Sequence, residues 1–164
     1  MPPGRVAADP AATAHITAMN TFTEHTGNLF DSDAKALGHG VNTEGRMGAG
    51  IAVAFRNADP DMYEAYRQEC WSGRLTAGGM FAYPCSGRWV YNIASQDLPG
   101  AHARLDWLDT GVRAALVHAR DHAVDSLALP RIGCGIGGLS WDEVSTVLAR
   151  AAARSGVKLE VWTL

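Results

Sequence analysis

The sequence predicts an α/β protein, a three-layer α/β/α sandwich around one mixed, largely parallel sheet. Strand-like and helix-like stretches alternate along the chain, a pattern typical of helices that cover both faces of such a sheet. The stretch "SLALPRIG" (126–133) is a near-continuous apolar run, as expected for a strand buried on both faces. Two glycine-rich stretches each separate a strand from a helix, the position at which open α/β sheets bind ligands.

The chain's 164 residues are 47% hydrophobic and carry a formal net charge of −3. This length favours one domain with one core, and the charge excludes a broad basic surface for non-specific nucleic-acid binding. We expect residues 1–15 to form a flexible tail and residues 16–164 to form the single domain. The start of the chain lacks the apolar segment of a secretory signal, and no apolar run approaches the roughly 20 residues of a membrane helix.

The number and spacing of the cysteines indicate the redox compartment of the protein. There are three of them, Cys70, Cys85 and Cys134, without motif spacing. An odd number of unpatterned cysteines favours reduced thiols in a cytoplasmic protein over a disulfide framework or a four-ligand zinc site. We therefore expect a cytoplasmic protein without a membrane partner.

Three elements are predicted in the first third of the chain. Residues 16–27 are rich in threonine and β-branched types and predict a strand. The short apolar stretch "ALGHGVN" (36–42) predicts a buried strand. A helix is expected over residues 48–57, directly after the first glycine-rich stretch.

The next two features are a helix and a hairpin. In residues 58–73, Asp59 is placed to cap a helix and Pro60 occupies its first turn, where a missing N–H costs nothing. Residues 78–84 and 88–94 then predict two strands on either side of a turn, Cys85-Ser86-Gly87.

The last third predicts two helices and two strands. Apolar residues at helical spacing predict a helix over 102–121. Gly111 lies inside it and costs about 1 kcal/mol against alanine, so we expect tight packing there. After the 126–133 strand, Ser140 and Glu143 predict a capping box for a helix that ends at Gly156. Apolar residues alternate with other residues at Val157, Leu159 and Val161, so residues 157–164 predict the final strand.

The two glycine-rich stretches, "HGVNTEGRMGAGIA" and "RIGCGIGGLSW", predict a phosphate site. Glycine lets main-chain N–H groups approach an anion, and the following helix adds its positive N-terminal end. Two such loops at one sheet edge would hold a diphosphate from both sides. A P-loop is excluded because that motif needs a glycine directly followed by a lysine, and the sequence has no such pair. Gly133, Gly135 and Gly138 fit a dinucleotide fingerprint with Glu160 beyond them, but too few residues follow to complete that fold.

The stretches "GNLF…ALGHGVNTEGRMGAGIAVAFR" and "LPRIGCGIGGLSWDEVSTVL", with a terminal "VWTL", resemble the macrodomains. Within them the chain is most similar to the terminal-ADP-ribose glycohydrolase-like subclass, which includes hydrolases of glutamyl-ADP-ribose and antitoxins that reverse DNA ADP-ribosylation. The resemblance covers roughly residues 18–164 and implies a macrodomain fold that binds ADP-ribose.

The resemblance also implies which residues bind ADP-ribose. It places Asn28 and Leu29 at the adenine end, where the family often has an aspartate instead of Asn28. An amide oxygen still accepts a hydrogen bond there, though more weakly. The two glycine-rich loops would embrace the diphosphate and distal ribose through Asn42, Arg46, Met47, Gly48, Ala49, Gly50 and Ile51 in the first loop, and Gly133, Cys134, Gly135, Ile136, Gly137, Gly138 and Leu139 in the second.

The catalytic pattern departs from the family. The resemblance expects a lysine and an aspartate at positions that here are Ser95 and Gly137. The only two lysines, Lys35 and Lys158, precede their strands and should lie at the opposite sheet edge. A covalent lysine intermediate is therefore not expected. Hydrolysis would proceed by direct attack of water, oriented by the substrate's phosphate or by a side chain, with Asn42, Gln96 and Asp97 as the candidates.

Other candidate sites are weaker. His118 and His122 lie four residues apart and could share a metal, but a solvated helix face is favoured. Cys134 is favoured as a small packing residue over a nucleophile. His39 is favoured as a core histidine whose ring nitrogens are satisfied by hydrogen bonds. Arg46 is placed equally well to contact phosphate or to face solvent. Trp141 directly follows the second loop and is a candidate wall of the pocket.

We therefore expect a hydrolase that removes ADP-ribose from modified acidic side chains, and that needs no cofactor or metal. The expected partners are ADP-ribose and ADP-ribosylated proteins, with ADP-ribosylated nucleic acid as a further class, and we expect a monomer. Two alternatives stay open: a non-catalytic ADP-ribose reader, and a phosphatase or deacylase acting on small ADP-ribose derivatives.

Overall fold

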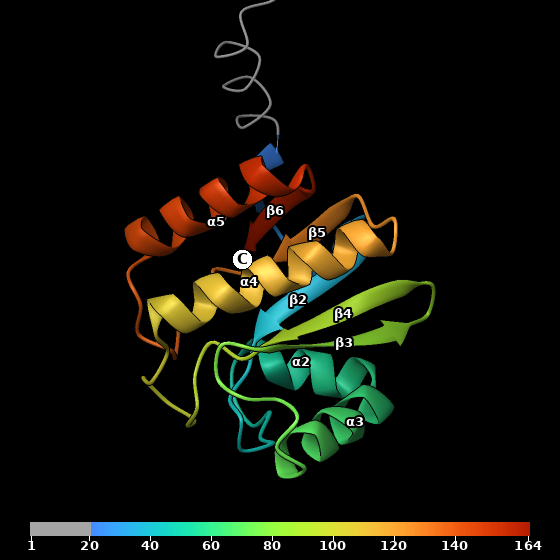
Figure 1. The fold of residues 1–164 in the computed structure, drawn as a ribbon, viewed down its shortest axis with the longest axis vertical. Coiled ribbons are helices and arrows are strands. Elements are labelled where there is room, and N and C mark those ends of the chain that lie inside the picture. The colour runs from blue at the N-terminus through green and yellow to red at the C-terminus, as the bar shows by residue number, and fades with distance from the viewer. Residues whose placement is uncertain (1–20) are drawn as a thin grey trace, which may run out of the picture.

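The structure, a computed structural model, describes residues 21–164 and contains one six-stranded sheet (Figure 1). The strand order is β1-β6-β5-β2-β4-β3, and all neighbours are parallel except β3 and β4. The mixed, largely parallel sheet is thus confirmed. The strands are β1 (Phe22–Thr26), β2 (Ala36–Gly40), β3 (Met80–Cys85), β4 (Arg88–Ile93), β5 (Ser126–Leu129) and β6 (Lys158–Thr163).

Helices cover both faces of this sheet, and the two faces have separate cores. The helices α4 and α5 pack against one face and α2 and α3 against the other (Figure 1). Helix pairs on opposite sides make the three layers that the sequence predicts. The helices are η1 (Leu29–Asp31, one 3₁₀ turn), α2 (Ile51–Ala58), α3 (Pro60–Trp71), α4 (Leu105–Asp121) and α5 (Trp141–Ser155).

The predicted order of strands and helices is confirmed, and so are several of the local signals. Asp59 caps α3 by accepting a hydrogen bond from the Met62 N–H, with Pro60 in the first turn. Ser86 and Gly87 form the hairpin turn with φ values of 49° and 85°. Gly156 ends α5 in the left-handed conformation.

Other local predictions need correction. Ser140 stands at the N-terminus of α5 but makes no side-chain capping hydrogen bond, so the predicted capping box is wrong. The helix predicted from residue 48 starts at Ile51, because the glycines before it belong to the loop. The strand predicted over 126–133 ends at Leu129, where Pro130 interrupts it. Of the strand predicted over 16–27, residues 16–20 lie outside the described part of the chain.

Between residues 21 and 164, no helix combines the length and the apolar character that spanning a membrane requires.

Candidate functional site

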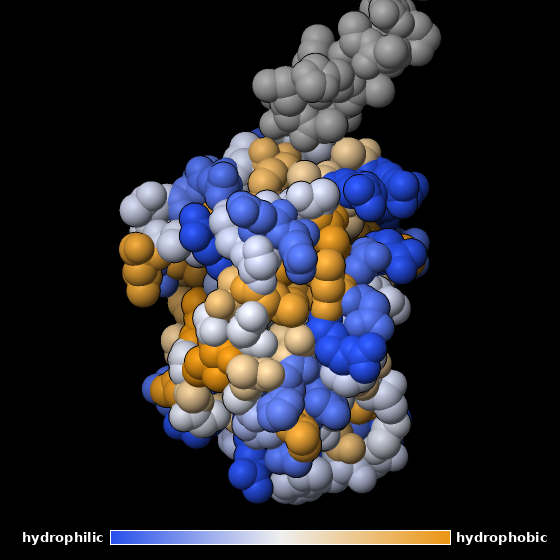
Figure 2. All heavy atoms as spheres, turned by 90° about the vertical axis from the view of Figure 1, so that its left-hand side faces the viewer, coloured by the Kyte–Doolittle hydropathy of each residue, from blue (hydrophilic) through white to orange (hydrophobic). Residues whose placement is uncertain are grey.

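A cleft of about 530 Å³ opens where β2, β4 and β5 end. Three segments border it: loop 1 (residues 41–50), the segment 95–104, and loop 2 (residues 130–140). Figure 2 views the molecule from the side on which these strands end, where apolar surface runs through the middle of the face between hydrophilic patches. The lining residues are Gly40, Val41, Asn42, Arg46, Gly48, Ala49, Gly50, Ile51, Ala52, Ser95, Gln96, Pro99, Gly100, Pro130, Arg131, Ile132, Gly133, Gly135, Ile136 and Gly137.

Loop 1 presents its main chain to the cleft. Gly48, Ala49, Gly50 and Ile51 all line the cavity, and their N–H groups have no hydrogen-bond acceptor within residues 21–164. Ile51 is also the first residue of α2, whose N-terminal end favours negative charge. A run of free N–H groups at a helix start is an anion-binding arrangement.

Loop 2 repeats this arrangement from the other side. Gly133, Gly135, Ile136 and Gly137 line the cavity, and again no acceptor for their N–H groups occurs in the described residues. The loop is closed by its own main chain, because the Leu139 N–H donates to the Gly133 carbonyl at 2.8 Å. The predicted convergence of two glycine-rich loops on one cavity is therefore present in the structure.

The charged side chains of the cleft are all cationic. Arg46 and Arg131 line it, while no aspartate, glutamate, histidine, lysine or cysteine of the described part of the chain does. The Arg46 side chain is 72% exposed, with a Glu44 carboxylate 3.7 Å away. The Arg131 guanidinium lies over the Trp141 ring, 4.8 Å from its centroid. Together with the free N–H groups, these arginines favour a ligand with at least two negative charges.

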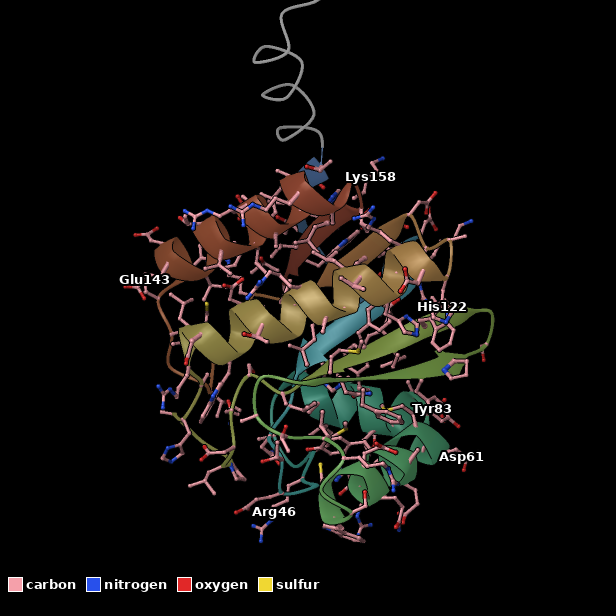
Figure 3. All side chains as sticks on the ribbon, in the orientation of Figure 1. Arg46, Asp61, Tyr83, His122, Glu143 and Lys158 are labelled. Carbon is pink, nitrogen blue, oxygen red and sulfur yellow. The ribbon has the colours of Figure 1, made fainter. Side chains whose placement is uncertain are left out.

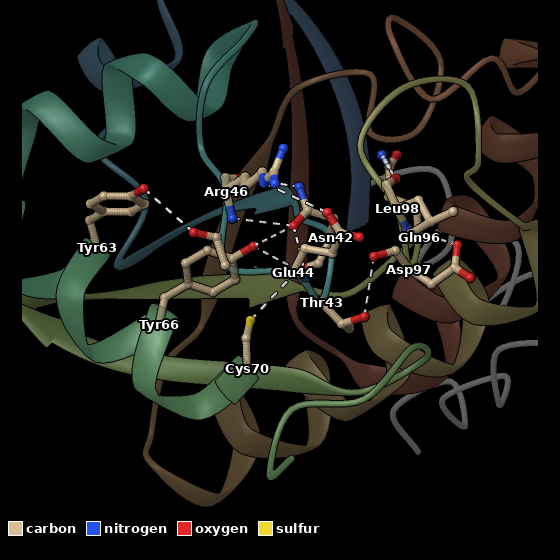
Figure 4. Close-up of polar contacts among 11 residues, drawn as sticks. Asn42, Thr43, Glu44, Arg46, Tyr63, Tyr66, Cys70, Gln96, Asp97 and Leu98 are labelled. Atoms are coloured by element: carbon tan, nitrogen blue, oxygen red, sulfur yellow. Dashed lines mark hydrogen bonds and ion pairs between the residues drawn. The ribbon is translucent and has the colours of Figure 1, made fainter. Parts of the chain in front are cut away.

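Asn42 organises loop 1 with its side chain (Figure 4). Its Oδ1 accepts hydrogen bonds from the N–H groups of Glu44 at 3.0 Å and Arg46 at 3.3 Å, and its Nδ2 donates to the Arg46 carbonyl at 2.9 Å. The side chain predicted to orient water or ribose is thus largely occupied by the loop itself, although Asn42 does line the cleft.

The other two catalytic candidates lie in the segment 95–104, and the structure separates them. Gln96 lines the cleft, with its Nε2 donating to the carbonyls of Leu98 and Gly100. Asp97 is not among the lining residues. Its carboxylate accepts from the Leu98 N–H, and its carbonyl accepts from the Thr43 N–H and hydroxyl. Asp97 therefore ties this segment to loop 1 and does not face the cavity.

Several other predicted binding residues lie outside the lining. Leu29 and Met47 are buried, and Asn28 caps η1 by accepting from the Phe30 N–H. Cys134, Gly138, Leu139 and Trp141 also do not line the cavity. The Cys134 thiol instead donates to the Ile132 carbonyl at 3.5 Å, and burial raises its pKa, which favours packing over nucleophilic chemistry.

The cleft also contains residues that sequence reasoning missed. Pro130 and Arg131 directly precede loop 2, so their position in the sequence was a usable signal. Pro99 and Gly100 come from the segment 95–104, which has no periodic pattern and no motif. The sequence placed only the start of this segment, Ser95 to Asp97, at the site; the position of Pro99 and Gly100 depends on packing of the segment against loop 2.

Ser95 and Gly137 occupy the positions at which the resemblance expects a lysine and an aspartate. Ser95 is 1% exposed and lines the cleft. A Cβ at Gly137 would stand 2.7 Å from the Gly133 carbonyl oxygen and 2.8 Å from Ala103 Cβ, so this position excludes a side chain unless the loop moves. Lys35 and Lys158 stand at the starts of β2 and β6, and Figure 3 shows Lys158 far from Arg46.

Two histidine predictions concern the rest of the molecule. His39 is fully buried, and its Nε2 lies 2.7 Å from Asn92 Oδ1. Its Nδ1 has no hydrogen-bond partner within residues 21–164, so the expected satisfied core histidine is correct in burial but only half satisfied. Burial lowers its pKa to about 4. His118 and His122 stack on each other with ring centroids 3.8 Å apart, and Nδ1 of His118 bonds with the Tyr91 hydroxyl. Residues 21–164 hold no cluster of three metal-ligating side chains.

Comparison with known proteins identifies related sequences. Residues 39–148 match the family model described as Macro domain. The DNA ADP-ribosyl glycohydrolase of Thermus aquaticus is 35% identical over 141 residues, covering 83% of this chain and 39% of that protein. The chain thus spans about two fifths of the length of this relative. The human ADP-ribose glycohydrolase OARD1 is 29% identical over 129 residues, covering 79% of this chain and 82% of that protein.

The fold has a matching solved structure. The macrodomain of Mycobacterium tuberculosis DarG aligns with a TM-score of 0.81 and 30% sequence identity, covering 87% of this chain and 97% of that one. The likeness in fold therefore extends over most of the chain.

Proposed function

Because the chain belongs to the Macro domain family, we propose that its cleft binds ADP-ribose and that the protein hydrolyses ADP-ribose esters of acidic side chains. One observation carries the binding proposal: within residues 21–164, one cavity is lined by two arginines, by no carboxylate residue, and by eight residues whose main-chain N–H groups have no acceptor there. A diphosphate is the ligand group that satisfies both loops at once. The names of the relatives support the hydrolytic part.

The proposed hydrolysis uses water directly. Water attacks the anomeric carbon of the distal ribose, and the bond from that carbon to the carboxyl oxygen breaks. The bonding electron pair leaves with the carboxylate, and the proton of the attacking water passes to a phosphate oxygen of the substrate or to solvent. Because a carboxyl group has a pKa of about 4, it leaves without being protonated. A cleft that lacks an acidic side chain therefore suits an ester.

Ser95, Gln96 and Asn42 border the cleft where this chemistry would occur. Their role is to restrict the position of the ribose and the water, since none of them is a strong base. Correct positioning alone can supply a large share of a rate enhancement. An ADP-ribose joined to a nucleobase nitrogen has a poorer leaving group, so we expect ADP-ribosylated DNA to be cleaved more slowly than the ester.

A second function, a non-catalytic reader of ADP-ribose, is favoured by one observation. No aspartate, glutamate, histidine or lysine in residues 21–164 lines the cleft, so this part of the chain offers no general base and no lysine nucleophile there. The same free N–H groups would still hold the diphosphate. Binding and hydrolysis must therefore be measured separately.

The deciding experiment pairs calorimetry with a release assay. The protein is titrated with ADP-ribose and then incubated with a glutamate-ADP-ribosylated protein and with ADP-ribosylated single-stranded DNA, and free ADP-ribose is followed over time. We expect micromolar binding and release from the ester ahead of the DNA. Binding without release would refute the hydrolase and support the non-catalytic reader. Absence of binding would refute both functions.

A further inference from the structure

Loop 1 differs from loop 2 in how it is held. Loop 2 closes through main-chain hydrogen bonds of its own, from Leu139 to Gly133 and from Cys134 to Arg131. Loop 1 has no such internal main-chain bond among the described residues; the Thr43 N–H instead donates outward to the Asp97 carbonyl. The Val41 N–H likewise donates outward, to the Ile93 carbonyl. Beyond Thr43, the conformation of loop 1 therefore depends on side chains.

The first of these side chains is Asn42, which closes the turn from residue 42 to residue 46. It accepts from two N–H groups of the turn and donates to the Arg46 carbonyl. Gly48 follows two residues after this turn and begins the run of free N–H groups that lines the cleft. A change in the orientation of Asn42 would therefore change the direction in which that run leaves the turn.

The second side chain is Tyr66, which holds Asn42 from helix α3 (Figure 4). Its hydroxyl donates to the Asn42 carbonyl at 2.6 Å and lies 3.1 Å from Asn42 Oδ1. Tyr66 is fully buried, and burial raises its pKa far above the usual value of 10, so the hydroxyl keeps its proton. Two other contacts from α3 are longer: Tyr63 to the Gly45 carbonyl at 3.4 Å and the Cys70 thiol to the Asn42 carbonyl at 3.9 Å.

We propose that Tyr66 is a positioning residue for ADP-ribose: its buried hydroxyl fixes Asn42, and Asn42 fixes the loop 1 N–H groups that receive the diphosphate. Tyr66 does not line the cleft and acts only through Asn42. The inference rests on the proposed function, because it assigns these N–H groups to the diphosphate.

The test is Tyr66→Phe, with Tyr91→Phe as the matched control. Both tyrosines are fully buried, and each hydroxyl makes a short hydrogen bond, but that of Tyr91 goes to His118, away from the cleft. The two variants should lose similar amounts of stability. By calorimetry, Tyr66→Phe should weaken ADP-ribose binding about five- to tenfold, the equivalent of one net hydrogen bond, whereas Tyr91→Phe should leave it unchanged.

A spectroscopic readout separates positioning from general destabilisation. In amide NMR spectra of Tyr66→Phe, the signals of Gly48, Ala49 and Gly50 should shift or broaden, while those of Gly135 and Ile136 should stay in place. Equal losses of affinity in the two variants, or loop 1 signals that do not move, would overturn the inference. If the unaltered protein does not bind ADP-ribose, the proposed function fails, and the loop 1 signals of Tyr66→Phe still report whether Tyr66 orders the loop.

Discussion

Gly50 of loop 1 and Ile136 of loop 2 approach each other at the cleft that both residues line. A Cβ built at Gly50 would stand 3.2 Å from Ile136 Cδ1, and Gly50 has a φ of +63° and a ψ of −149°, a conformation available almost only to glycine. Ile136 is 50% exposed although it is a large apolar residue. Both residues line the cleft, so we expect the exposed Ile136 side chain to cover a bound diphosphate and to exclude water from it.

Ile136→Ala tests this cover. Shortening the side chain should open the cleft to water and weaken ADP-ribose binding about three- to tenfold, a loss of about 1 kcal/mol. Stability should change by less than about 0.5 kcal/mol because the residue is half exposed. Calorimetry and thermal unfolding give the two quantities. Val117→Ala is the control, since Val117 is 56% exposed on α4 and does not line the cleft; equal binding losses in both variants would contradict the prediction.

Glycines of the two loops should respond differently to substitution. Gly48 and Gly135 have no atom within 4 Å of an added Cβ and no positive φ, so Gly48→Val and Gly135→Val should fold normally. Because both positions line the cleft, the added side chain should occupy ligand space and lower ADP-ribose affinity by at least about tenfold.

The control for this pair is Gly133→Ala. Gly133 has a φ of +76°, and its Cβ would lie 3.0 Å from Leu108 and from Leu139, so this variant should lose stability as well as binding. Urea unfolding and calorimetry on all three variants separate the two effects. Normal ADP-ribose binding by folded Gly48→Val and Gly135→Val would mean that the diphosphate does not lie between the loops.

The sequence was most informative where a short-range rule acts. The Asp59-Pro60 pair and Gly156 mark helix ends through local backbone chemistry, and the alternation of apolar runs is enough to order strands and helices. The Ser140 cap failed because a matching residue pattern does not fix the side-chain rotamer. The glycine loops were found because each occurs between a strand and a helix, which any α/β sheet brings to one edge.

The rest of the site depends on contacts between distant segments. The segment 95–104 packs on loop 2, where the Ala103 N–H donates to the Gly137 carbonyl. No periodic pattern in the sequence predicts this contact. Tyr66 lies 24 residues from Asn42, and as a helical tyrosine it looks like any other core residue. Only the packed structure distinguishes a tyrosine that fills space from one that orders a binding loop.

Gly111→Ala tests whether the cost of overpacking exceeds the gain in helix propensity. Alanine is favoured over glycine in a helix interior by about 1 kcal/mol. A Cβ at Gly111, however, would stand 2.7 Å from Ile93 Cγ2 and 3.1 Å from the Gly79 carbonyl oxygen, and overpacking of this kind costs about 1–3 kcal/mol. We expect a net loss in the free energy of unfolding, measured in urea. A more stable Gly111→Ala protein would show that α4 can move away from the sheet without cost.

We expect His39 to contribute to the pH dependence of the free energy of unfolding. Its pKa is lowered from 6.5 to about 4 because burial disfavours the charged ring. Between these values the unfolded chain binds a proton that the folded protein does not, so stability rises with pH across this window. The contribution is complete above pH 6.5 and is lost as the pH falls toward 4, by about 3 kcal/mol in all.

His39→Gln isolates this contribution from that of the carboxylates. The variant lacks the titrating ring, so its free energy of unfolding should fall less than that of the unaltered protein between pH 7 and pH 4.5, whatever its stability at pH 7. Urea unfolding at several pH values measures both slopes, and the NMR signals of the His39 ring should show no protonation at pH 5.5. Parallel slopes, or a ring that titrates near 6.5, would mean that His39 is hydrated in solution and that its stack on Phe55 under α2, with ring centroids 3.9 Å apart, opens readily.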